Sequence, residues 1–231
     1  MGEGVVAVEG PGSTLLLGSA AVALVAVAVR PIRTFTGHLS TAAHEGGHAL
    51  VALLLGYRVQ GIRLHADQSG LTRHHGPERG AGRVAVAAAG YPAPSLLGLG
   101  GATLLSSGFD PLAPLLVGVM VLGGLLLLVR NLFGALVLVG LGTAFVAITY
   151  RADPAVQRAA AYTLTWFLLL SGLRDVAVLR SVRRTGLQLS DADQLRRLTR
   201  LPGLVWELIF GLVALGCLLL AARWMLDRPP A

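Results

Sequence analysis

The sequence contains no lysine, a single cysteine and few charged residues. Charged residues make up 13% of the 231 residues, whereas a soluble domain carries about 25%. The single cysteine, Cys217, excludes an internal disulfide and a zinc site built from cysteine thiolates. All 19 basic residues are arginines, and they gather in short segments between apolar stretches. This distribution is typical of the signals that orient membrane proteins, and it does not indicate a partner such as nucleic acid.

Long apolar segments recur along the whole chain, and 54% of all residues are hydrophobic. Each segment approaches the roughly 20 residues that a helix needs to cross a bilayer. Two of them are separated only by Arg130 and Asn131, so six and seven transmembrane helices are both consistent with the pattern. We therefore predict an all-α polytopic membrane protein that forms a single domain over residues 1–231. The apolar segments lie at about 14–29, 34–55, 84–105, 111–129, 131–149, 159–179 and 203–222.

Two polar stretches separate these segments and carry most of the remaining sequence information. Residues 56–83 include an alternating run, YRVQGIRLH, and a turn sequence, DQSG, which together predict a short β-hairpin. Residues 180–202 hold six arginines, so we expect both stretches to be cytoplasmic. Ser190 and Asp193 have the spacing of a capping box, which indicates an amphipathic helix at the membrane surface.

The apolar segment 34–55 contains a cluster of ionisable residues, His44-Glu45-Gly-Gly-His48. Positions i and i+4 share one face of a helix, so both histidines can present nitrogen atoms to a single metal ion. The neighbouring glutamate can reach a water molecule at that ion, as in zinc hydrolases. Ionisable groups inside a membrane cost free energy unless they are paired, which favours a functional site. We therefore predict that His44 and His48 bind Zn²⁺ and that Glu45 is a general base.

The two glycines inside this motif, Gly46 and Gly47, indicate a close approach to the helix backbone. Each costs about 1 kcal/mol relative to alanine in a helix interior. A neighbouring helix and an extended substrate strand would both explain them.

The motif and the residues after it, HEGGHALVALLLGYRVQGIRLH, resemble the site-2 protease family of intramembrane zinc metallopeptidases. The similarity is closest to the small bacterial branch related to the sporulation-factor processing proteases, and it covers a core of about residues 34–180. The resemblance implies a β-hairpin after the motif helix and a third zinc ligand from an aspartate in a later membrane helix. That family carries this aspartate in a Leu-Asp-Gly motif, which the present sequence lacks.

Asp175 is the residue that we predict as the third ligand on the basis of this resemblance. It is the one aspartate inside a segment long enough to be a membrane helix, and its expected depth matches that of His48. The alternative is that Asp175 pairs with an arginine near the end of the helix. Asp191 and His65 are the first residues to consider if Asp175 does not bind the metal.

Three further residues are candidates for the wall of a substrate cleft. Pro92 and Pro94 interrupt a helix, and the exposed carbonyl groups that result are tolerated where they are buried or line a cavity. His38 precedes Glu45 by two helical turns and could face the same cleft, although packing would also explain it.

The sequence therefore predicts a multi-pass metalloprotease of a bacterial cell membrane. Its cofactor would be Zn²⁺, its partners a membrane-protein substrate and the lipid bilayer, with no nucleic acid. Two other functions are consistent with the same residues: a non-proteolytic membrane protein that binds or transports a cation, and an inactive member of the family.

Overall fold

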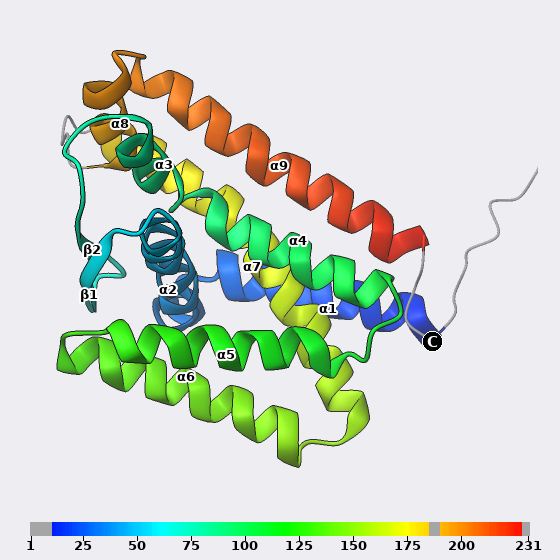
Figure 1. Ribbon diagram of the computed structural model, residues 1–231. Coiled ribbons are helices and arrows are strands. Elements are labelled where there is room, and N and C mark those ends of the chain that lie inside the picture. The colour runs from blue at the N-terminus through cyan, green and yellow to red at the C-terminus, as the bar shows by residue number, and fades with distance from the viewer. Residues whose placement is uncertain (1–10, 185–189, 228–231) are drawn as a thin grey trace, which may run out of the picture.

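A computed structural model describes residues 11–184 and 190–227 and shows a mostly helical protein with one small sheet (Figure 1). This confirms the predicted fold class. The elements are α1 (Pro11–Ala28), α2 (Arg30–Leu54), β1 (Arg58–Leu64), β2 (Gly70–His75), α3 (Ala81–Ala88), α4 (Pro92–Ser106), α5 (Leu112–Leu128), α6 (Leu132–Arg151), α7 (Pro154–Arg184), α8 (Asp191–Thr199) and α9 (Gly203–Asp227).

Fewer of these helices are long enough to cross a bilayer than the predicted six or seven. Among the described residues, 3 helices qualify by length and composition: α6, α7 and α9. Counting α1 with α2 and α3 with α4 as broken spans raises the number to 5, with bends of 97° and 67°. Proline explains both breaks, since Pro31 lies in the first turn of α2 and Pro92 begins α4. A proline has no backbone N–H group, so it can start a helix but cannot continue the preceding one.

The long helix α7 forms the centre of the bundle and packs against α1, α4 and α9 (Figure 1). The main core contains Tyr162, Phe167 and Leu169 from α7, together with apolar residues of α1 and α4. Helices α5 and α6 pack against each other and against the lower part of the bundle in Figure 1. Many leucine and valine side chains on the outer surface are exposed, as expected for a protein that faces lipid.

Strands β1 and β2 form the predicted antiparallel hairpin, with an irregularity between Val59 and Gly61. The turn between α5 and α6 holds the outer edge of β1. The backbone N–H of Arg130 donates to the Ile62 carbonyl at 2.8 Å. The Asn131 side chain donates to the Leu64 carbonyl at 2.8 Å and accepts from the Leu64 N–H at 3.2 Å. The hairpin is thereby fixed beside the middle of α2, which contacts both strands.

Candidate metal centre

The two motif histidines lie one turn apart on α2, and their Nε2 atoms are 3.1 Å from each other. The Nδ1 atom of His48 lies 2.7 Å from the backbone carbonyl oxygen of Val86 in α3. In a neutral ring this contact requires a hydrogen on Nδ1, so Nε2 keeps its free electron pair. A metal-binding histidine is commonly oriented by such a bond from its second nitrogen. The geometry therefore suits His48 Nε2 for a metal ligand.

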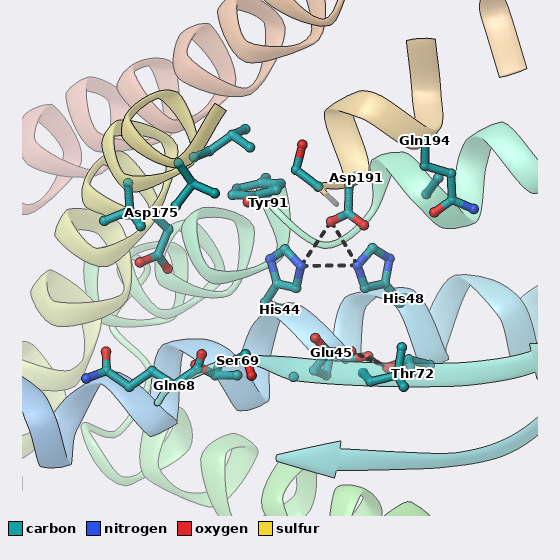
Figure 2. A pocket seen from close by; sticks show the side chains of 18 of the residues that line it. His44, Glu45, His48, Gln68, Ser69, Thr72, Tyr91, Asp175, Asp191 and Gln194 are labelled. Carbon is teal, nitrogen blue, oxygen red and sulfur yellow. Dashed lines mark hydrogen bonds and ion pairs between the residues drawn. The ribbon is translucent and has the colours of Figure 1, made fainter. Parts of the chain in front are cut away.

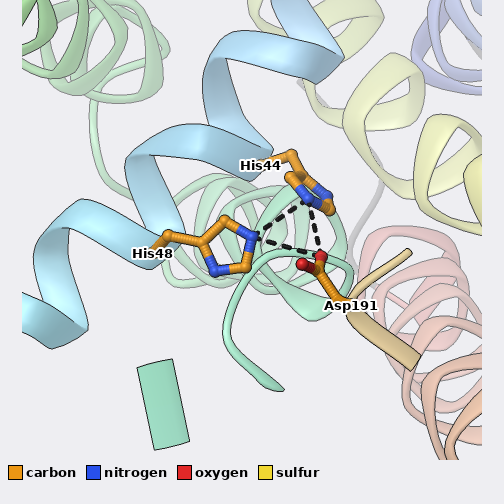
Figure 3. Close-up of side chains that lie close together, drawn as sticks. All are labelled: His44, His48 and Asp191. Carbon is orange, nitrogen blue, oxygen red and sulfur yellow. Dashed lines mark hydrogen bonds and ion pairs between the residues drawn. The ribbon is translucent and has the colours of Figure 1, made fainter. Parts of the chain in front are cut away.

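Asp191, the first residue of α8, brings a carboxylate to the same point (Figure 3). Its Oδ2 atom lies 3.1 Å from His44 Nε2 and 3.2 Å from His48 Nε2. The three donor atoms form a nearly equilateral triangle. Among the described residues, no other group of histidine, cysteine, aspartate or glutamate side chains converges in this way. In a tetrahedral zinc site with bonds of about 2.0–2.1 Å, neighbouring ligand atoms are roughly 3.3 Å apart. Two imidazoles and a carboxylate at these separations fit a zinc ion.

The surroundings of Asp191 favour the anionic form that a metal ligand needs. Burial alone would raise the pKa of this carboxyl group, but the positive charge of a protonated His48 and the hydrogen bonds with both histidines lower it below the usual range. A deprotonated carboxylate at this position is ready to bind a cation.

Asp175, the predicted third ligand, lies outside this group of donor atoms. Its carboxylate accepts hydrogen bonds from the Ser40 hydroxyl at 2.5 Å and from the Arg174 guanidinium at 3.1 Å. It therefore has partners of its own, as in the alternative considered from the sequence. Asp191 lies beside the histidines because α8, which packs against α3 and α9, begins next to them, and the lengths of the apolar segments did not indicate this. The donor atoms that converge are those of His44, His48 and Asp191, and the role of Asp175 as a ligand stays a prediction from the sequence.

Glu45 is buried next to the histidines and is held by the hairpin. Its Oε2 atom accepts a hydrogen bond of 2.6 Å from the Thr72 hydroxyl in β2, which also lies 3.1 Å from the Glu45 backbone oxygen. Gly70 begins β2 directly against this carboxylate, where a Cβ atom would overlap the Glu45 side chain. The strand thus limits the orientations open to Glu45.

Gly90 is a site residue that the sequence reasoning missed. It lies in the turn between α3 and α4, and a Cβ atom there would overlap the Nε2 atoms of both His44 and His48. Its neighbour Tyr91 places its ring edge-on to the His44 ring, with centroids 4.7 Å apart. The signal in the sequence was the glycine that directly precedes the Tyr-Pro-Ala-Pro stretch.

The residues proposed for the cleft wall pack against other parts of the protein. Gly46 faces Leu125 of α5, whereas Gly47 lies so close to Ala89 and Ala93 that a Cβ atom would overlap them. These contacts correspond to the neighbouring-helix explanation. The His38 ring meets the edge of a phenylalanine ring, and Pro94 is buried in the bundle. Pro92 belongs to the first turn of α4.

The candidate metal centre opens into a cleft of about 570 Å³ between α2, β2, α7 and α8 (Figure 2). None of the five residues proposed from the sequence for its wall is among the described residues that line it. Asp175 and Gln68 lie toward one side of His44, and Gln194 lies beyond His48 on the other side. Most of the residues that line the cleft are polar or charged, although polar and apolar surface contribute about equally; the polar ones include Glu45, Gln68, Ser69, Thr72, Arg83, Arg174, Asp175, Gln194 and Arg197.

The fold and this site together define a polytopic membrane protein with a candidate metal centre beside a buried glutamate. A profile of the family described as Peptidase M50B-like matches residues 17–221. The chain therefore belongs to this family of membrane metallopeptidases, and the resemblance to site-2 proteases is confirmed. Searches of curated proteins and of solved structures gave no significant match.

Proposed function

We propose that the protein is a zinc-dependent endopeptidase that cleaves a membrane-protein substrate within or next to the bilayer. One observation carries the proposal: two imidazoles and a carboxylate converge at 3.1–3.2 Å beside a buried glutamate, at the base of a polar cleft in a helical membrane protein. Membership of a metallopeptidase family supports the same reaction.

His44, His48 and Asp191 would hold the zinc ion, which leaves one position open for water or substrate. When bound, zinc supplies a Lewis acid that makes hydroxide available near neutral pH and polarises a carbonyl group. The chain's own contribution to the ion is orientation. His48 is fixed by the Val86 carbonyl, and the ring of Tyr91 packs against His44.

Glu45 would act as the general base. Its carboxylate takes a proton from the attacking water and delivers it to the amine that leaves when the peptide bond breaks. The Thr72 hydroxyl holds one of its oxygens, Oε2, whereas Oε1 lies against Gly70, where the missing side chain leaves space beside the oxygen. A base that is held by a fixed hydrogen bond loses less freedom when the reaction begins.

The substrate has to reach this site as an extended segment. The carbonyl groups of an intact helix are hydrogen-bonded to N–H groups four residues away, which shields them from attack. We therefore propose substrates with helix-weakening residues near the cleavage point. A bacterial plasma membrane is the location that we propose, since the arginine-only basic composition with abundant glycine suggests such a source.

The proposal is tested by measuring zinc content and proteolysis on the same purified protein. We expect about one zinc per chain, and loss of zinc in His44→Ala and in His48→Ala. The double variant with undiminished zinc would exclude this site. Zinc binding without cleavage of any membrane substrate would instead favour a metal-binding or transport protein, or an inactive family member.

The third ligand is tested by comparing two aspartates that both line the cleft. We expect Asp191→Ala to lower zinc affinity sharply, because it removes one of three ligands. Asp175→Ala should leave zinc affinity nearly unchanged, because its carboxylate is engaged with Ser40 and Arg174. The reverse order of effects would restore Asp175 as the ligand.

A further inference from the structure

Arg183, near the end of α7, connects three helices through two buried carboxylates. Its Nε atom lies 3.1 Å from Asp193 Oδ1 in α8, and its guanidinium also donates to Glu207 in α9. The side chains of Asp193 and Glu207 are only 5% and 8% exposed. Two acidic groups in such a position need a positive partner, because an unpaired buried charge is strongly destabilising.

Asp193 extends this network to the residues around Asp191. Its second oxygen, Oδ2, accepts a hydrogen bond of 2.6 Å from the Ser190 hydroxyl. Ser190 caps α8 in return, which confirms the capping box predicted from the sequence. One carboxylate thus joins Arg183 to the first turn of the helix that begins with Asp191.

The start of α9 is shaped around the same guanidinium. A Cβ atom on Gly203 would overlap the Arg183 nitrogens, so a side chain here would displace the arginine. The other face of α8 rests on an apolar cluster in which Ala192 and Leu195 meet Leu179 and Phe210. Packing of this kind holds the helix on the bundle, whereas hydrogen bonds with defined directions set its rotation.

We propose that Arg183 is a positioning residue for the metal centre, which it serves by fixing the first turn of α8 so that Asp191 meets the two histidines. This inference rests on the proposed function, since it assumes that Asp191 is a zinc ligand. A buried ion pair often adds little to stability when compared with an apolar replacement. The Arg183 ion pairs instead fix the direction of the Asp191 side chain, as residues that surround metal ligands commonly do.

The test uses the full-length protein in detergent and measures zinc affinity, the absorption spectrum with Co²⁺ in place of zinc, and thermal unfolding without metal. We expect Arg183→Ala to weaken zinc binding by about 10- to 100-fold and to alter the Co²⁺ spectrum. Arg183→Lys should recover part of the zinc affinity. Lysine restores the positive charge but lacks the planar guanidinium that contacts both Asp193 and Glu207. Arg184→Ala is the matched control, because Arg184 is the exposed neighbour with the same charge.

Asp193→Asn tests the same inference if Arg183→Ala does not fold. It weakens the bond to Arg183 but keeps an oxygen that can accept from Ser190, and it too should lower zinc affinity. Wild-type zinc affinity and an unchanged Co²⁺ spectrum in the folded Arg183 or Asp193 variants would overturn the inference. Failure of the wild-type protein to bind zinc would overturn the proposed function itself, so the two failures are distinguishable.

Discussion

The Glu45 carboxylate is held by a hydrogen bond from the Thr72 hydroxyl. Glu45→Gln keeps a side chain of the same shape that can still accept this hydrogen bond, but it removes the base. We expect the variant to retain zinc and to lose proteolytic activity by about 10²- to 10⁴-fold. Metal analysis and a cleavage assay on one preparation check both points. Cleavage at the wild-type rate would show that Glu45 is not the base.

Gly90 offers a sharper test of the same centre, because it lies against both histidines without donating a ligand. Gly90→Ala places a methyl group where the two Nε2 atoms meet. We expect zinc binding to be lost or strongly weakened, as measured by titration. Gly100→Ala in α4 is the matched control, since nothing lies within 4 Å of a Cβ atom there. Equal zinc affinity in both variants would show that the turn can move aside.

Local spacing explains why part of the centre could be predicted from the sequence. His44 and His48 are related by helical periodicity, and Glu45 is adjacent to them, so one segment defines all three. Asp191 and Gly90 belong to other elements, and no periodic pattern links them to the motif. The expected depths of residues along straight membrane helices favoured Asp175 as the third ligand instead. These depths took no account of α8, which brings the Asp191 carboxylate within 3.1–3.2 Å of the two histidine Nε2 atoms.

Strand β2 holds the Glu45 carboxylate by a hydrogen bond from the Thr72 hydroxyl group. Thr72→Val keeps the branched shape of the side chain but leaves the Glu45 carboxylate without its donor. We expect a fall in kcat of roughly tenfold or more with zinc content unchanged, because a neutral or charge-assisted hydrogen bond contributes about 1–3 kcal/mol. Thr72→Ser should restore activity, because the hydroxyl group returns. Wild-type kcat in Thr72→Val would mean that the hairpin does not orient the base.

Helices and strands were easier to predict than the breaks within them. Each apolar segment became a helix or a pair of helices, and the alternating run after the motif became β1. The sequence separated the segments 14–29 and 34–55 but treated them as two independent spans, whereas α1 and α2 meet at 97° next to Pro31 and together qualify as one broken span. Hydrophobic length alone does not distinguish a straight span from two helices that meet at an angle.

For the molecule as a whole, the hairpin and α8 both border the cleft, so the two arginine-rich stretches lie at one end of the bundle (Figure 1). We predict that this end faces the cytoplasm. In a Cys217→Ala background, an impermeant thiol reagent added outside intact cells should label Ser107→Cys but not Arg73→Cys or Arg196→Cys. All three should react in opened membranes. Outside labelling of Arg73→Cys would reverse the orientation.

Asp191 belongs to the last part of the chain to be synthesised, whereas both histidines lie in its first quarter. A growing chain therefore holds two of the three proposed ligands long before the third exists. The proposed mechanism requires all three, so the newly made protein would stay inactive until Asp191 has reached the histidines of α2. Under the proposed function, the order of biosynthesis would thus protect neighbouring nascent membrane proteins from premature cleavage.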